Sequence, residues 1–305
     1  MASSSSDQKG PVGTAIALSP PPWNTRATMY LIAFWTSAKI ASDLPPKAFH
    51  PLELQSSFAS PKFGNPTGGL SMIQLIRYHD TPVGPYDEMI LSPGSFEYPD
   101  PSSSPASSSK TKKKAMRITR IYVSQEKTCF NGRKLWNIPK HLARFEWVDD
   151  PSSGATTIKV YPHDTAATPY DPKESSPSDA PFFQCTLKAV PYLPSIPFST
   201  SLLKTIGMDY TIVQPPLPEG TQAASNELPG TGDEWTRLSD FVQHSKQTSV
   251  VWADLSQKDK SSGIAPDQYE NFWPGLGRWH LALKMDNGQA DFGHGVKWTT
   301  PSYLL

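Results

Sequence analysis

The sequence predicts a mainly β (β-rich α+β) protein that folds as an antiparallel barrel or sandwich with few short helices. Short apolar runs of strand length recur along the chain, and proline-rich, polar segments separate them. The 32 prolines are about double the usual share for 305 residues, and they favour turns over long helices. Many short strands separated by turn signals are typical of all-β folds.

The first half of the chain contains three strand candidates. Met29 to Trp35 is a short apolar run rich in aromatic residues, which predicts a strand. Residues 41–70 are expected to be mostly loop, because prolines and a Gly-Gly pair interrupt them. Two further strands are expected over residues 72–76 and 86–91, joined by the proline-rich turn at 81–85.

The stretch from Arg117 to Trp147 is the one around which the other segments are organised. It is expected to begin as a strand, because Ile118, Ile121 and Val123 are apolar among polar neighbours and Tyr122 is aromatic. It is predicted to break at Asn131-Gly132 and to end in a second apolar run, residues 145–148.

The second half continues the β pattern, with one ambiguous segment. Residues 233–244 carry apolar side chains at helical spacing after Asp233, a possible N-cap, but the same residues could form a pair of strands. The other strand candidates are residues 155–161, 182–190, 210–213, 250–253, 279–285 and 296–298.

The domain organisation is expected to be one domain with polar insertions. Residues 1–16 are predicted to be a disordered tail and residues 17–305 a single domain, with low-complexity insertions near 97–116, 162–181 and 215–233. The insertion at 97–116 contains several lysines, which could serve nuclear import or polyanion binding. A solvated loop tip is the simpler interpretation, because loops tolerate insertions.

Composition excludes several classes of function. The 28 acidic and 28 basic side chains balance, so no global field indicates a nucleic acid or a membrane surface as a partner. The most apolar run is far shorter than the ~20 residues of a membrane span. The first residues lack the apolar stretch of a signal peptide, and two distant cysteines specify no disulfide framework. We therefore expect a cytoplasmic protein.

Signals for cofactors and metals are also weak. Gly275-Leu276-Gly277 lacks the third glycine of a dinucleotide fingerprint, and no phosphate-binding loop occurs in the sequence. The seven histidines show no paired metal-ligand spacing. We expect a protein that works without cofactor or metal.

Lys140 is the main catalytic candidate. It follows an apolar residue and a proline, which stiffen the chain and hold it extended. Only the free amine attacks a carbonyl carbon, and burial favours that form because it disfavours the charged one. The alternative is a lysine that extends its amine to solvent at the surface.

The segment GRKLWNIPKHLA, residues 132–143, resembles the lysine-bearing segment of the acetoacetate decarboxylase-like superfamily. In that family a Gly-Arg pair is followed by an aromatic residue and by a Pro-Lys whose amine forms an imine with a carbonyl substrate. PPWNTRATMYLIAF at 21–34 and RYHDTPVGPYDEMILSPGSF at 77–96 are similar to two other family segments, and the resemblance covers roughly residues 20–148. It implies a cone-like, partly closed β-barrel around the active site, in a member of fungal type.

The resemblance implies roles for four further residues. Glu88 matches the family's acidic position and would move protons at the imine, and Tyr86 would line the same wall, because alternate residues of a strand share a face. Arg26 is the nearest match to the arginine that holds the substrate carboxylate, with Arg133 as the alternative.

At position 141 the chain departs from the family. The decarboxylases proper carry a second lysine there, whereas this chain has His141, which is mostly neutral at pH 7. If the two residues lie on a strand, their side chains point to opposite faces. Burial would then have to lower the pKa of Lys140.

Together these features predict a lyase that forms a Schiff base through Lys140 and decarboxylates a β-keto acid. Two alternatives remain open. One is an aldolase-dehydratase or hydratase that uses the same imine, with His141 at the substrate as a residue that would suit its extra proton transfers. The other is a barrel that binds a small molecule without catalysis. The expected partner is a small keto acid, and the family resemblance implies a homo-oligomer.

Overall fold

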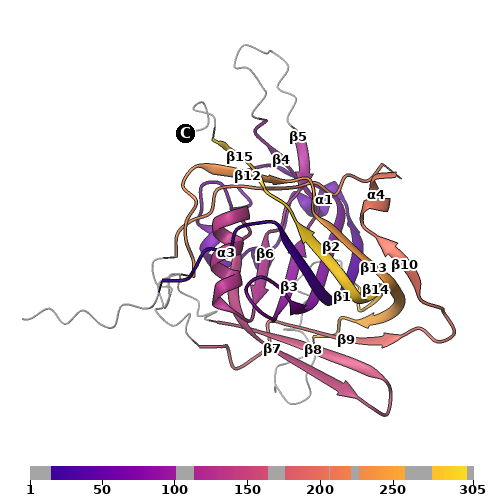
Figure 1. The fold of residues 1–305 in the computed structure, drawn as a ribbon. Coiled ribbons are helices and arrows are strands. Elements are labelled where there is room, and N and C mark those ends of the chain that lie inside the picture. Colours follow the sequence, from indigo (N-terminus) through magenta and orange to yellow (C-terminus); the bar gives the residue numbers. More distant parts are fainter. Residues whose placement is uncertain are drawn as a thin grey trace, which may run out of the picture.

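Nine strands close into a mixed barrel (Figure 1). The computed structural model describes residues 15–100, 113–163, 176–205, 207–220, 227–257 and 277–300. The barrel closes because β2 pairs with both β3 and β1. In order around it the strands are β1 (Trp23–Thr36), β14 (Trp279–Phe292), β13 (Val242–Asp254), β9 (Phe183–Ala189), β8 (Ala155–Pro162), β7 (Lys140–Asp150), β6 (Arg120–Val123), β3 (Tyr86–Ser92) and β2 (Pro66–Asp80).

Beyond β2 the sheet continues into short strands outside the barrel. They are β4 (Ser95–Tyr98), β5 (Lys113–Met116), β11 (Ile212–Gln214), β12 (Glu234–Leu238) and β15 (Val296–Thr299), while β10 (Ile196–Ser199) pairs with β13. The predicted fold class is confirmed, and the pairing is antiparallel with two exceptions. The pairs β6–β7 and β5–β11 are parallel.

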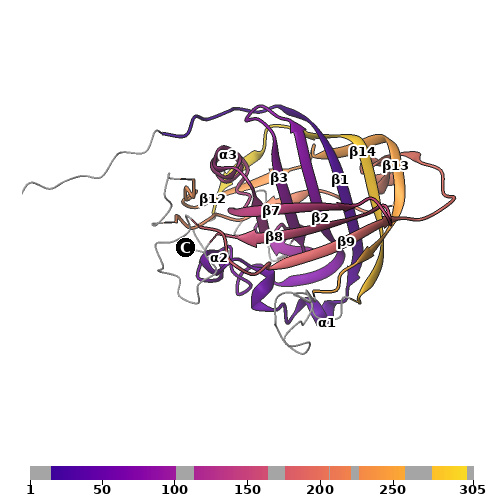
Figure 2. The ribbon, with the colours of Figure 1, turned by 90° about the horizontal axis from the view of Figure 1, so that it is seen from below.

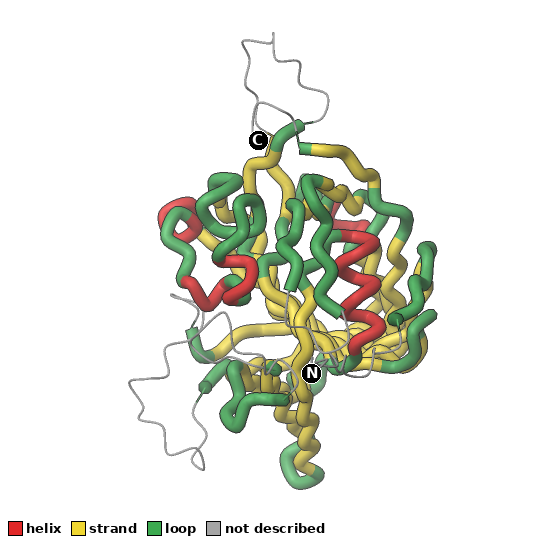
Figure 3. The backbone as a smooth tube through the Cα atoms, turned by 90° about the vertical axis from the view of Figure 1, so that its left-hand side faces the viewer, coloured by secondary structure: helices red, strands yellow, loops and turns green. Residues whose placement is uncertain are grey.

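Helices are few and short among the described residues (Figure 3). They are α1 (Ala38–Ala41), the 3-10 turn η1 (Pro46–Ala48), α2 (Pro51–Leu54), α3 (Glu126–Trp136) and α4 (Ser201–Thr205). The longest, α3, has 11 residues. In the described part of the chain, no helix has the length and apolar character needed to cross a membrane.

The structure corrects one local prediction and decides another. The expected break at Asn131-Gly132 is wrong, because both residues lie inside α3. The helix is capped at its C-terminal end by Asn137, which has the left-handed conformation with φ 55°. A parallel pair such as β6–β7 needs a crossover, and α3 supplies it. Residues 233–244 contain β12 and the start of β13, so strands are the correct alternative to a helix, although these two strands pair with other strands and not with each other.

The polar insertions lie only partly within the described residues. The ends of the segment 97–116 pair as the β4–β5 hairpin, which contains Lys113 and Lys114. Lys110 and Lys112 of the same lysine-rich stretch fall outside the described residues. The same holds for residues 1–14 of the expected tail and for most of the segment 162–181. The assignment of a single domain with a tail stays a prediction.

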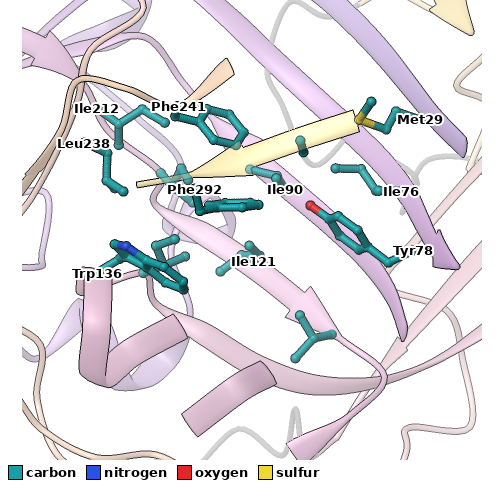
Figure 4. Close-up of a cluster of buried hydrophobic side chains, with 14 of the residues drawn as sticks. Met29, Ile76, Tyr78, Ile90, Ile121, Trp136, Ile212, Leu238, Phe241 and Phe292 are labelled. Carbon is teal, nitrogen blue, oxygen red and sulfur yellow. The ribbon is translucent and has the colours of Figure 1, made fainter. Parts of the chain in front are cut away.

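The strands β3 and β6 and the middle of β1 and β2 are buried on both faces. Figure 2 shows β1, β2 and β3 side by side from a second direction. Met29 packs in one apolar cluster and the next residue, Tyr30, in another. Ile121 and Tyr122 divide in the same way, because successive side chains of a strand point to opposite faces. Figure 4 shows the first cluster, with Ile90 and Ile121 near Phe292. This division decides where Lys140 and His141 point.

Candidate active site

The crossover helix α3 shapes the space around Lys140. Lys140 is the first residue of β7, and it pairs with Ile121 of the parallel strand β6. A Cβ atom at Gly132 of α3 would lie 2.5 Å from Cδ of Lys140. The Sγ of Cys129, one turn earlier on the helix, donates a hydrogen bond of 3.2 Å to the carbonyl oxygen of Lys140. Glycine at 132 therefore makes room for the lysine side chain.

The amine of Lys140 is buried and paired. Its Nζ lies 2.7 Å from Oε2 of Glu88 and donates a 2.9 Å hydrogen bond to Oγ1 of Thr128. The side chain of Lys140 is 4 % exposed and that of Glu88 is 2 % exposed. Nζ also lies 5.0 Å from the ring centroid of Tyr86, within cation–π range. Tyr78 donates a 3.3 Å hydrogen bond to the other oxygen of Glu88.

These partners reverse the expected shift of the Lys140 pKa. Burial lowers that pKa more than any other single cause, but the carboxylate of Glu88 and the phenol of Tyr86 together outweigh it, so the net shift is upward. The amine is therefore held as an ammonium ion. Burial also raises the pKa of Tyr86 to about 12 and that of Tyr78 well above its usual value, so both phenols keep their protons at neutral pH.

Lys140 and Glu88 lie on the wall of a mostly apolar cavity of about 20 Å³. That volume holds roughly one water molecule, so a larger ligand requires lining side chains to move. Two of these, Met72 and Met116, have flexible side chains that adapt readily. The remaining lining residues are Gln74, Ile90, Ser92, Ile118, Ile121, Ile138, Tyr210, Ile212, Leu238, Phe241 and Phe292. Among these described residues Lys140 is the only cation.

His141 points to the opposite face of β7, into a buried ionic cluster. Its Nε2 lies 2.8 Å from Oε2 of Glu53, and Arg133 donates a 2.9 Å hydrogen bond to the other oxygen of Glu53. The ring of His50 stacks on that of His141, with centroids 3.3 Å apart. We call His50, Glu53, Arg133 and His141 the ionic cluster. All four are at most 3 % exposed.

The ionic cluster has its own electrostatic balance. Burial raises the pKa of Glu53, but His141 and Arg133 outweigh it and the net shift is downward. The pKa of His50 is well below its usual value, first because of burial and then because of nearby positive charges. Arg133 also donates to the carbonyl oxygens of residues 218 and 229, which fixes α3 against that segment.

The same cluster contains three possible metal ligands, which histidine spacing in the sequence did not indicate. One donor atom each from His50, Glu53 and His141 lie within 4.8 Å of one another. However, Arg133 hydrogen-bonds the Glu53 carboxylate and lies 3.4 Å from Nε2 of His141. A guanidinium ion at this place opposes a second cation. We therefore interpret the cluster as a structural ion-pair network.

The candidate site residues are thus divided between three places. Lys140 and Glu88 line the cavity, and the ring of Tyr86 lies beside the amine. Arg133 and His141 belong to the ionic cluster. Arg26 lies inside β1, not before it, and is 69 % exposed in an ion pair of 3.0 Å with Asp80.

Sequence reasoning missed several residues next to the amine. Thr128 and Gly132 are one helical turn apart and share the face of α3 toward Lys140, but the expected break hid their spacing. Tyr78 falls inside the recognised segment at 77–96, on the same face of β2 as Ile76.

No protein-family model and no curated protein sequence matches the chain. Solved structures do resemble it. An acetoacetate decarboxylase aligns with a TM-score of 0.50 and 13% identity, over 94% of this chain and 93% of that one. The enduracididine biosynthesis enzyme MppR, complexed with pyruvate, aligns with a TM-score of 0.50 and 13% identity, over 97% and 100%. The acetoacetate decarboxylase from Legionella pneumophila aligns with a TM-score of 0.48 and 12% identity, over 99% of this chain and 94% of that one.

The two likenesses with a TM-score of 0.50 define the class of fold. The chain has the fold of acetoacetate decarboxylase and related enzymes, as the resemblance of its sequence segments implied. At such low identity the comparison shows the fold and leaves the reaction to be argued from the residues of the cavity.

We predict that Gly132→Ala destabilises the protein by about 1–3 kcal/mol, because the new methyl group overlaps the held side chain of Lys140. Alanine normally stabilises a helix interior by about 1 kcal/mol relative to glycine. A loss of stability in Gly132→Ala would therefore indicate the overlap with Lys140. Urea unfolding measures the effect. Lys134→Ala, at an exposed position of the same helix, is the control and should change stability little. In a double-mutant cycle with Lys140→Ala the penalty should vanish, and its persistence would contradict the contact.

Removing the charge of Glu53 should destabilise the protein by about 3–5 kcal/mol at neutral pH, because Glu53→Gln leaves buried positive charge unpaired. Folding lowers the pKa of Glu53 below its unfolded value of about 4.5. The Glu53 carboxylate therefore stabilises the folded protein fully above that pH, and this stabilisation is lost as the pH falls through the lower pKa of the folded state. Between roughly pH 3 and pH 7, the free energy of unfolding should therefore change less with pH in Glu53→Gln than in the wild type. Asp80→Asn, in the exposed pair with Arg26, should cost under about 1 kcal/mol. Equal losses in both variants would exclude the ionic cluster as a stabilising element.

Proposed function

We propose that the protein is a Schiff-base-forming lyase that decarboxylates a β-keto acid through Lys140. The observation that carries the proposal is the buried ion pair of 2.7 Å between Lys140 and Glu88 on the wall of an apolar cavity. A lysine paired to a carboxylate at hydrogen-bond distance has a base to receive its proton. The fold shared with acetoacetate decarboxylase is consistent with this assignment.

The chemistry begins with a proton transfer. Glu88 takes a proton from the ammonium group of Lys140, and the free amine adds to the ketone carbon to form a carbinolamine. Glu88 then returns the proton to the hydroxyl group, which leaves as water and produces a protonated imine. The ion pair is restored at this stage, because the positive imine nitrogen lies against the Glu88 carboxylate. The raised pKa of Lys140 therefore does not block the reaction, provided that its proton moves to Glu88 as the ketone enters.

The carbon–carbon bond breaks in the second stage. The electron pair of the bond to the carboxylate moves into the protonated imine, CO2 leaves and a neutral enamine remains. The enamine carbon takes up one proton that comes from solvent, and water hydrolyses the imine to release the ketone and the amine. Thr128 and Tyr78 would hold the lysine and the carboxylate in position throughout.

The composition of the cavity supports decarboxylation over the alternatives. A substrate carboxylate there would meet apolar side chains and the Glu88 carboxylate, with Lys140 as the only cation of the described lining. Loss of CO2 removes that unfavourable charge. His141, which we expected to suit the proton transfers of an aldolase-dehydratase, bonds to Glu53 on the other face of β7. A cytoplasmic location and a homo-oligomeric state stay predictions.

Borohydride reduction followed by intact-protein mass measurement tests the imine. Acetoacetate, pyruvate and longer β-keto acids would each be incubated with the protein, and we expect an adduct that maps to Lys140 for at least one β-keto acid. Lys140→Ala should abolish it, whereas Lys134→Ala should retain it. Release of CO2 would then distinguish decarboxylation from aldol chemistry. A folded protein that binds a keto acid without forming an adduct would favour the non-catalytic barrel.

Glu88→Gln should separate the two roles of the carboxylate. Without Glu88, burial dominates and the pKa of Lys140 falls, so imine trapping should reach its plateau at a lower pH than in the wild type. Turnover should decrease by roughly 10²–10⁴-fold, because the proton acceptor is lost. The pH profile of trapping and the rate of CO2 release give the two readouts. A trapping profile that does not move would contradict the pairing of Glu88 with the amine.

A further inference from the structure

A polar triad occupies one part of the apolar cavity. Gln74 of β2 donates a 3.0 Å hydrogen bond to the hydroxyl of Tyr210, and Gln243 of β13 donates a 2.7 Å hydrogen bond to Oε1 of Gln74. Tyr210 completes the ring with a 3.3 Å hydrogen bond to Oε1 of Gln243. We call these residues the amide–phenol triad. All three are at most 4 % exposed, and Gln74 and Tyr210 line the cavity that also contains Lys140.

The triad has hydrogen-bond donors that meet only weak acceptors. The amide nitrogen of Gln74 also lies 3.9 Å from the sulfur of Met72, and that of Gln243 lies 3.5 Å from the sulfur of Met29. A thioether is a weak acceptor, so each amide has an N–H group that an oxygen atom would satisfy better. Of these two amides, the one that lines the cavity is Gln74.

The hydrogen-bond donors of the triad are uncharged, so they suit an uncharged oxygen atom of a ligand better than a carboxylate. Burial raises the pKa of Tyr210, so the phenol keeps its proton. No arginine or histidine is among the described residues that line the cavity. A carboxylate placed against the triad would lose its hydration without gaining a cation, whereas a ketone, hydroxyl or ether oxygen needs only a hydrogen bond.

The register of the sheet places the triad beside the reacting groups. Gln74 pairs with Ile90, and Glu88 pairs with Ile76, so Gln74 and Glu88 are diagonal neighbours on adjacent strands. Their Cα atoms are therefore separated by roughly 7–8 Å. The ring of Tyr210 is held by stacking on Phe241, with centroids 6.0 Å apart, and Phe241 packs on Phe292 (Figure 4). Because Gln74, Tyr210 and Lys140 line one cavity, a substrate that enters it by moving lining side chains would contact both the amine and the triad.

We propose that the amide–phenol triad binds a second, neutral oxygen of the substrate, so that the substrate class is an oxygenated keto acid or ketone in preference to a plain alkyl one. The inference deepens the proposed function, since it concerns the same cavity. Gln74 provides the N–H group that contacts the oxygen, and Tyr210 and Gln243 orient that amide.

Matched ketones test this specificity without a decarboxylation step. Hexan-2-one and 4-methoxybutan-2-one differ by one methylene replaced with an ether oxygen, and heptan-2-one and 5-methoxypentan-2-one form a second pair with the oxygen further along. The dissociation constant of each would be measured by calorimetry on the full chain and on its Lys140→Met variant, which cannot form an imine. Borohydride trapping on the wild type would follow.

We expect one ether ketone to bind about tenfold more tightly than its hydrocarbon partner, in the wild type and in Lys140→Met. Gln74→Met and Tyr210→Phe should each reduce that preference by about fivefold or more. Tyr30→Phe, a buried tyrosine in the other apolar cluster, should leave it unchanged. Preference for the hydrocarbon in both pairs, or a preference that survives both triad variants, would overturn the proposal.

The two proposals fail in distinguishable ways. An ether preference without any trapped adduct would contradict the imine at Lys140 and support the triad. Trapped adducts without an ether preference would support the imine and exclude the triad as a specificity element. Binding of neither ketone class would count against both.

Discussion

Burying the ammonium group of Lys140 beside the carboxylate of Glu88 imposes the main constraint on this barrel. Removing two charges from water costs several kcal/mol for each ion unless their remaining hydrogen-bonding capacity is satisfied. Thr128 accepts from the amine, and Tyr78 donates to the carboxylate. The helix α3 helps to meet this requirement, because it supplies Thr128 and, one turn later, the glycine that leaves room for the lysine stem.

The strand β7 separates two buried charged groups with different roles. Lys140 faces the cavity, and the next residue, His141, faces Glu53 and Arg133 on the other side. Because Arg133 comes from α3 and Glu53 from α2, the ionic cluster ties both helices to the strand that carries the lysine. The family-like Gly-Arg pair thus has two functions in one helical turn. Gly132 makes space for the amine, and Arg133 anchors the helix.

The cavity contains the ion pair of Lys140 and Glu88 and neutral polar groups of the amide–phenol triad. The ion pair would form the imine, and the triad would bind a second substrate oxygen. The imine needs a proton acceptor next to the amine, and Glu88 provides it at 2.7 Å. A departing carboxylate needs no strong cationic partner, and the described lining offers Lys140 alone. The oxygen that the substrate keeps throughout the reaction would be bound by neutral donors, and the amide–phenol triad provides these.

The sequence by itself determined the β class and most strand positions, and it singled out Lys140, Glu88 and Tyr86, whose side chains lie next to one another in the structure. These features are local: apolar alternation marks strands, and the recognised segments contain the three residues. It did not determine α3, because an Asn-Gly pair is a turn signal unless a parallel crossover requires a helix. It also could not bring His50 and Glu53 to His141, or Gln74 to Tyr210 and Gln243, since those contacts join residues far apart in the chain. The tertiary structure alone decided these contacts. It also placed Arg26 away from the cavity, in an exposed ion pair with Asp80, because side chains on one strand alternate between its two faces.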